Sequence, residues 1–157
     1  MRWVNWVIVT IAVTVWLAAI FAWAPRIESA WFPPLERRII NTHQTPDLLT
    51  LWFSGIKNRD CLLTAVSATW VYPNGLAMPT ALVRDDGTIV GAQVTTNFRA
   101  GDRFISGPFT VRITQAVAAE PQIRLRVVNT YRCRFPWDVY VQTWLPLADV
   151  PTTPPVP

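Results

Sequence analysis

An apolar run opens the chain. Residues 3–24 carry no charged side chain, and the only polar side chains among them are those of Asn5, Thr10 and Thr14. About 20 apolar residues suffice to cross a hydrocarbon core of about 30 Å. Tryptophan favours the boundary between lipid and water, and it flanks the run at both ends: Trp3, Trp6, Trp23 and Trp31. The pattern predicts a single transmembrane helix over residues 1–24.

A cleaved signal peptide is the alternative for this run, because Ala22-Trp23-Ala24 fits a small-x-small cleavage pattern. The run is longer than the apolar core of a typical signal peptide, only Arg2 precedes it, and Pro25 would follow the cut. We therefore expect residues 1–24 to be retained as a signal anchor. The basic residues near its two ends do not decide its orientation.

Residues 25–58 are predicted to form a linker with one short helix. Three prolines predict that no continuous helix connects the span to the following domain: Pro25, Pro33 and Pro34. Residues 35–40 fit either a helical turn or a short strand. Thr45-Pro46-Asp47 resembles a helix start and Gly55 a helix stop, so we predict a helix between them that closes one end of the domain or lies on the bilayer.

Residues 59–146 alternate strand patterns with turn signals. The strands are expected at residues 61–72, 80–84, 88–98, 109–117, 122–134 and 139–145. Six or seven short strands predict an all-β domain, an antiparallel immunoglobulin-like sandwich, with a small open barrel as the alternative. Residues 147–157 are rich in proline and predict an extended tail.

The chain has two cysteines, Cys61 and Cys133, and both lie on predicted strands. We predict a disulfide between them, which would place the domain outside the cytoplasm, in the periplasm. Two buried thiols in a cytosolic domain are the alternative.

The formal net charge is +4, and Lys57 is the only lysine among the 14 basic residues. Arginine binds phosphate and carboxylate groups through a planar fork. Along residues 122–134, Ile123, Leu125, Val127, Tyr131 and Cys133 share one strand face by the period-two rule, and the other face is basic. That face carries Arg124, Arg126, Arg132 and Arg134, and we expect Arg112 to join it from the preceding strand.

This basic row predicts binding of an anionic partner: lipid head groups, lipopolysaccharide phosphate or an acidic protein. An ordinary solvated strand face with acidic neighbours is the alternative. Nucleic acid is not expected, because the domain is predicted to be external and no aromatic residue is interleaved on that strand face to stack bases.

Small residues recur every four positions along the predicted span: Thr10, Thr14, Ala18 and Ala22. Small residues let two helices approach closely in a membrane. The stripe predicts helix packing with a protein partner or self-association, although alanine and threonine are also common in spans.

Catalytic patterns are missing from the sequence. His43 is the only histidine and lies in the polar linker, and most acidic residues fall in predicted turns. We expect no metal site, no cofactor, no small-molecule substrate and no enzymatic activity. The favoured function is a membrane-tethered, non-enzymatic interaction module that binds a protein or an anionic envelope partner outside the cytoplasm. A structural subunit of a secretion, conjugation or phage-derived membrane assembly is the alternative, and a hydrolase built on His43 or an aspartate pair is less favoured.

Overall fold

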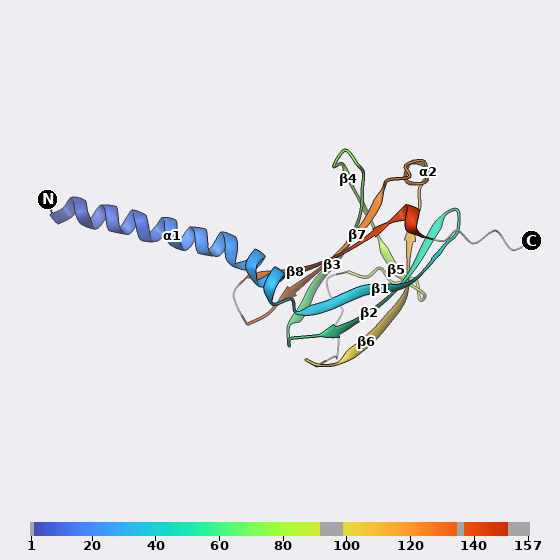
Figure 1. The fold of residues 1–157 in the computed structure, drawn as a ribbon, viewed down its shortest axis with the longest axis horizontal. Coiled ribbons are helices and arrows are strands. Elements are labelled where there is room, and N and C mark those ends of the chain that lie inside the picture. The colour runs from blue at the N-terminus through green and yellow to red at the C-terminus, as the bar shows by residue number, and fades with distance from the viewer. Residues whose placement is uncertain (1, 92–98, 135–136, 151–157) are drawn as a thin grey trace, which may run out of the picture.

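The computed structural model describes residues 2–91, 99–134 and 137–150. A long N-terminal helix leads into a β domain made of two antiparallel four-stranded sheets (Figure 1). In sheet A the strands run in the order β1 (Leu35–Gln44), β2 (Leu48–Lys57), β6 (Arg103–Arg112), β5 (Leu82–Arg84). In sheet B the order is β4 (Ala77–Thr80), β3 (Leu62–Val71), β7 (Arg124–Arg132), β8 (Asp138–Pro146). The prediction of an antiparallel β domain after an apolar helix is confirmed.

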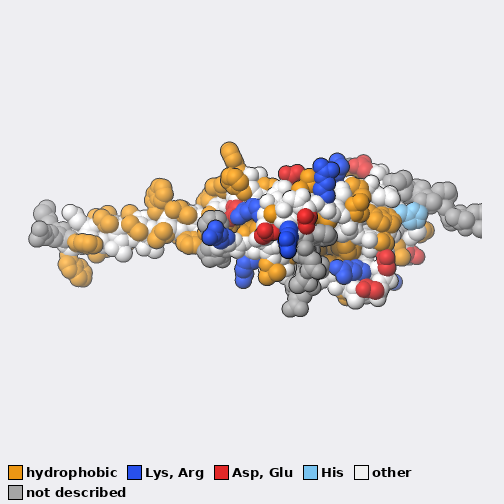
Figure 2. Space-filling model, turned by 90° about the horizontal axis from the view of Figure 1, so that it is seen from below, with side chains coloured by type: hydrophobic (Ala, Val, Ile, Leu, Met, Phe, Trp, Pro, Cys, Tyr) orange, Lys and Arg blue, Asp and Glu red, His pale blue; other side chains and the backbone are white. Residues whose placement is uncertain are grey.

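The first helix, α1 (Arg2–Trp31), is 30 residues long, and its part from Asn5 to Trp31 is apolar enough to span a membrane. Figure 2 shows apolar side chains along the helix and charged side chains gathered on the β domain. Of the three prolines that were expected to end the helix, Pro25 does not do so, because it lies inside α1. Proline removes one helical hydrogen bond, but the helix continues past it because its last turns pack on the β domain. The helix ends at Trp31, just before Pro33 and Pro34.

The predicted short helix between Thr45 and Gly55 is also wrong, because this segment forms β2. Leu49, Leu51 and Phe53 are buried at alternate positions, as a strand requires. β2 lies between β1 and β6, so pairing on both sides outweighs the local helix signals. Residues 35–57 therefore belong to sheet A, although the sequence suggested a linker there, and residues 35–40 are part of a strand.

The hydrophobic core lies between the two sheets. Its largest fully buried side chains are Trp70 from β3 and Phe53 from β2. The indole N–H of Trp70 donates to the carbonyl of Arg112 in β6, at 3.2 Å, and so links sheet B to sheet A. On β7, the inward row predicted from the alternation is confirmed, and it is buried: Leu125, Val127 and Tyr131, with Ile123 just before the strand.

Several predicted elements change their limits. The strand predicted over residues 109–117 ends at Arg112, because Thr114 caps the short helix α2 (Gln115–Ala118) and Val117 enters the core from that helix. The turn Asp85-Asp86-Gly87 is present, with Gly87 at φ 80° and the Arg84 N–H donating to the Thr88 carbonyl. Most of the strand predicted over residues 88–98 lies outside the described residues, as does the predicted tail after residue 150. The first part of that tail is not extended, because Leu147–Asp149 form a 3-10 helix and Leu147 and Val150 are buried in the core.

Candidate interaction surfaces

A buried carboxylate joins α1 to the β domain. The side chain of Glu28 accepts hydrogen bonds from Arg59 through Oε1 and from the indole N–H of Trp137 through Oε2. Glu28 is only 8% exposed, and a buried carboxylate is tolerated when both oxygens are paired. Arg59 follows β2 and Trp137 precedes β8, so Glu28 connects the helix to segments from both sheets.

Two further contacts extend this junction along the helix. The N–H of Tyr140, on edge strand β8, donates to Ser29 Oγ at 3.0 Å, and the Phe21 ring packs edge-on against Trp137 with 6.0 Å between ring centroids. The contacts from Phe21 to Ser29 cover about two helical turns, so side-chain packing on the β domain helps to set the helix direction. The sequence alone did not indicate this junction, although Glu28 is the only acidic residue before Glu36.

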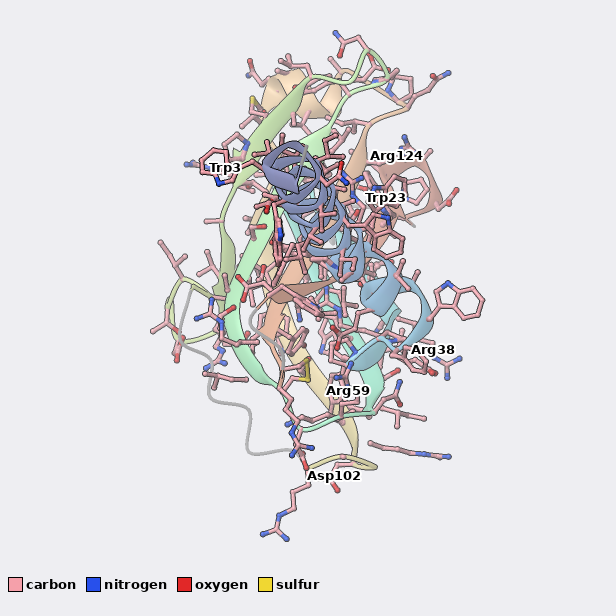
Figure 3. All side chains as sticks on the ribbon, turned by 90° about the vertical axis from the view of Figure 1, so that its left-hand side faces the viewer. Trp3, Trp23, Arg38, Arg59, Asp102 and Arg124 are labelled. Carbon is pink, nitrogen blue, oxygen red and sulfur yellow. A yellow bond between two sulfur atoms is a disulfide. The ribbon has the colours of Figure 1, made fainter. Side chains whose placement is uncertain are left out.

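The predicted disulfide between Cys61 and Cys133 is present. It joins the residue before β3 to the residue after β7, which are neighbouring strands of sheet B. Leu35, Leu63 and Tyr131 form a small buried cluster beside it. The bond therefore closes the end of sheet B that lies next to α1, and it is the bond drawn in yellow in Figure 3.

The structure divides the predicted row of arginines. Arg124 and Arg132 lie at opposite ends of β7, about 26 Å apart at about 3.3 Å per residue. Arg126 lies near the Arg124 end of β7, and Arg134 lies two residues beyond Arg132. The expectation that Arg112 joins them from a neighbouring strand is wrong, because β6 lies in sheet A and β7 in sheet B.

Two arginines of β7 lie against one exposed tryptophan of β8. The guanidinium carbons of Arg124 and Arg126 are 5.1 Å and 5.6 Å from the ring centroid of Trp144, which is within range for cation–π attraction. Trp144 pairs in register with Arg126 and is 42% exposed. We call Arg124, Arg126 and Trp144 the Trp144 patch. Figure 3, in which α1 points toward the viewer, separates Arg124 from Arg59 at the junction.

The aromatic residues on the outer face of sheet B could not be placed there from the sequence of β7 alone. No aromatic residue is interleaved on that face of β7, but β8 brings Tyr140 and Trp144 to the same outer face of sheet B. This removes one of the two reasons for not expecting nucleic acid there. Residues 138–146 alternate between inward and outward positions. This alternation places Tyr140 and Trp144 beside the arginines of β7 only when the pairing of β7 with β8 is known.

Arg132, at the other end of β7, has an acidic neighbour. Its Nη2 lies 3.0 Å from Asp138 Oδ1, and the two residues are paired in register between β7 and β8. Exposed ion pairs of this kind contribute only about 0–1 kcal/mol. For Arg132, this contact fits the alternative of a solvated strand face with acidic neighbours.

Arg37 of β1 points between the sheets. Its Nε donates to Thr143 Oγ1 at 3.1 Å, its Nη1 donates to Asn129 Oδ1 at 3.0 Å, and its guanidinium lies 4.2 Å from the centroid of Phe53. Burial lowers the pKa of Arg37 to about 10. No carboxylate of the described residues pairs with it, so polar side chains of β7 and β8 hold a buried positive charge.

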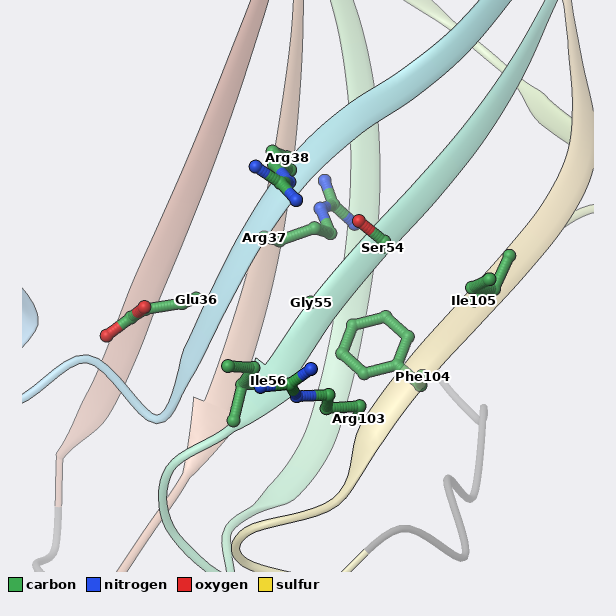
Figure 4. Close-up of a pocket in the computed structure, with 9 residues that line it drawn as sticks. All are labelled: Glu36, Arg37, Arg38, Ser54, Gly55, Ile56, Arg103, Phe104 and Ile105. Carbon is green, nitrogen blue, oxygen red and sulfur yellow. The ribbon is translucent and has the colours of Figure 1, made fainter.

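A hollow of about 930 Å³ lies along the neighbouring strands β1, β2 and β6 (Figure 4). Its lining residues are Glu36, Arg37, Arg38, Ser54, Gly55, Ile56, Arg103, Phe104 and Ile105. Neither His43 nor an aspartate lines it, so it lacks the groups on which the hydrolase hypothesis depended. Among the described residues, no three His, Cys, Asp or Glu side chains form a possible metal site.

The small-residue stripe of α1 is exposed along the helix. The hydroxyl of Thr10 donates to the carbonyl of Trp6 at 2.9 Å, and that of Thr14 donates to the carbonyl of Thr10 at 2.8 Å. Both hydroxyl protons are thus used within the helix. The stripe offers a partner helix close packing rather than hydrogen-bond donors.

Replacing Thr14 and Ala18 together by leucine is expected to abolish self-association of the full-length protein in a membrane two-hybrid assay, because the larger side chains prevent close helix approach. The matched control replaces Val15 and Ala19 by leucine on another side of the helix and should leave the signal unchanged. Equal association of both variants and the parent would show that the stripe is not a packing surface.

No protein-family model matches the chain, and comparisons with curated proteins and with solved structures also find no significant match.

Proposed function

We propose that the protein is a membrane-tethered, non-enzymatic binding module. In this proposal α1 is the anchor and the Trp144 patch binds an anionic protein or envelope polymer outside the cytoplasm. The observation that carries the proposal is the stacking of two arginines on one exposed tryptophan. Tryptophan and arginine dominate the energetics of many binding interfaces, because they combine a large apolar surface with directed hydrogen bonding.

The position of the patch favours such a partner over the lipids of the anchoring membrane. Arg124 begins β7, whereas α1 packs near Asp138 and Tyr140, at the other end of the strand pair. The length of β7 between the two ends is about 26 Å. Exposed charges are largely screened beyond about 10 Å at ordinary salt concentrations, so a partner of the patch must itself reach that far above the membrane.

The domain fold that we propose is an immunoglobulin-like sandwich. When β1 to β8 are lettered A, B, C, C′, D, E, F and G, the strand orders read A-B-E-D and C′-C-F-G. This agrees with the two sheets of immunoglobulin domains with one added edge strand, and Trp70 supplies the buried tryptophan of strand C. The disulfide differs, because it links C with F within one sheet. The fold by itself does not imply a function.

The disulfide supports a location outside the cytoplasm, because such bonds persist in oxidising compartments. A structural role in a larger membrane assembly is the second candidate, and the packed junction at Glu28 favours it. A detergent-solubilised complex of defined stoichiometry, measured by native mass spectrometry, would select that role.

Replacing Arg124 and Arg126 by glutamine is expected to weaken binding of the full-length protein to an acidic polypeptide by roughly tenfold, because the exposed Arg124 and the partly exposed Arg126 each contribute up to about 1 kcal/mol. Immobilised protein in neutral nanodiscs, probed with poly-L-glutamate at low and physiological salt, measures this. The loss should be largest at low salt, where screening is weakest.

The matched control for this experiment replaces Arg103 and Arg112 by glutamine, since both arginines are exposed on sheet A. The control should bind like the parent. If the variant with both patch arginines replaced also binds like the parent at low salt, the outer face of sheet B is an ordinary solvated face and the proposed function is wrong.

A further inference from the structure

We infer that the end of the β domain next to α1 forms a second membrane contact, in which Trp137 lies at the bilayer interface and Arg26 and Arg134 bind phosphate groups of anionic lipids. We call these three residues the membrane collar. The inference goes beyond the proposed function and rests only on α1 spanning the membrane.

The contact between Trp137 and Phe21 fixes the depth of the Trp137 side chain in the membrane. Phe21 lies within the uncharged run of residues 3–24, three residues before its end, which is about 4.5 Å along the helix axis. The hydrocarbon core takes up about 30 Å, and this run is barely longer. A side chain packed on Phe21 is therefore held at the boundary between acyl chains and head groups.

The orientation of Trp137 suits that boundary. Its ring meets Phe21 on one side, and its N–H donates to Glu28, which lies two turns farther from the membrane centre. A tryptophan with its apolar ring toward lipid and its N–H toward polar groups is typical of interfaces. On the helix itself, the guanidinium carbon of Arg26 lies 5.8 Å from the ring centroid of Trp23, so a second tryptophan and an arginine lie together near the end of the uncharged run.

The charges at this end are suited to anionic lipid. Arg59 and Arg132 already pair with Glu28 and Asp138, whereas no carboxylate of the described residues forms an ion pair with Arg26 or Arg134. Arg134 is exposed and lies three residues from Trp137, so its backbone is within about 11 Å of the interface level. Exposed arginines held this close to a bilayer attract anionic lipids.

The depth of Trp137 can be measured in nanodiscs whose lipids carry bromine near the top of the acyl chains, because bromine quenches tryptophan fluorescence at close range. The emission lost in the variant Trp137→Phe should be the strongly quenched part of the spectrum. The emission lost in Trp144→Phe, a variant of the distant patch, should be insensitive to bromine. Equal and weak quenching of both components would overturn the inference.

Lipid selectivity tests the arginines without changing Trp137. Full-length protein released from nanodiscs of equal phosphatidylglycerol and phosphatidylcholine content should retain mainly phosphatidylglycerol in native mass spectrometry. Replacing Arg26 and Arg134 by glutamine should lower that preference at least roughly fivefold. Replacing Arg124 and Arg126 should leave it unchanged.

The two pairs of variants separate the two proposals. Failure of the collar variant to change lipid preference overturns the collar and leaves poly-L-glutamate binding by the Trp144 patch unaffected. A loss of lipid preference in the patch variant instead of the collar variant would also overturn the collar, because it would place the lipid contact at the wrong end of β7.

Discussion

Replacing Cys61 and Cys133 together by alanine is expected to lower the free energy of unfolding of the β domain by about 4 kcal/mol. The bond closes a loop across a sequence separation of 72 residues, and in the chain-entropy model a cross-link of that length restricts the unfolded chain by about this amount. Urea unfolding of the full-length protein in a non-ionic detergent, followed by tryptophan fluorescence, measures the change.

Reduction of the parent protein provides the control for the disulfide. Dithiothreitol should move the unfolding midpoint of the parent to that of the double variant and leave the variant itself unchanged. Maleimide labelling of denatured, unreduced protein should add no mass. Two labelled thiols would show that the bond is not formed in the mature protein and would remove the main support for an extracytoplasmic domain.

Replacing Arg37 by alanine is expected to lower the free energy of unfolding by about 3 kcal/mol. The change removes the donor from which Asn129 Oδ1 and Thr143 Oγ1 accept hydrogen bonds, and each unpaired buried polar atom costs about 1–3 kcal/mol. It also empties the space over Phe53. Removing the buried charge offsets part of the loss in the free energy of unfolding, because burial alone disfavours the charged form of Arg37.

Two control variants separate these contributions. Arg37→Met keeps most of the volume and should lose clearly less stability than Arg37→Ala. Arg38→Ala, at the exposed next position, should change stability by less than about 0.5 kcal/mol. If Arg37→Ala is as stable as Arg38→Ala in urea unfolding, the guanidinium does not hold the two sheets together.

Features that depend on local pattern could be predicted from the sequence. The apolar run predicts α1, and the alternation along residues 122–134 predicts which side chains of β7 are buried, because a strand face follows directly from period two. β2 could not be predicted, since Thr45, Pro46 and Gly55 fit a helix locally. Pairing with β1 and β6, which no local pattern shows, decides its structure.

The candidate surfaces depend still more on distant contacts. The Trp144 patch requires the register between β7 and β8, and the junction requires Glu28 to meet Trp137, 109 positions later. In both cases, no pattern in the local sequence marks the residue as part of a contact with a distant segment. Cys61 and Cys133 are the exception, because two cysteines on predicted strands of one membrane-anchored domain leave only one possible pair.

In the proposed membrane-anchored protein, the packed junction fixes the direction in which the Trp144 patch faces around the membrane normal. Successive residues of a helix are turned by about 100°, and the contacts of Phe21, Glu28 and Ser29 hold the β domain to one side of α1. A partner helix that binds α1 at Thr14 or Ala18 therefore also fixes the direction in which the β domain faces. One residue inserted between Ala18 and Phe21 would swing the patch by about 100° without altering any residue of the β domain.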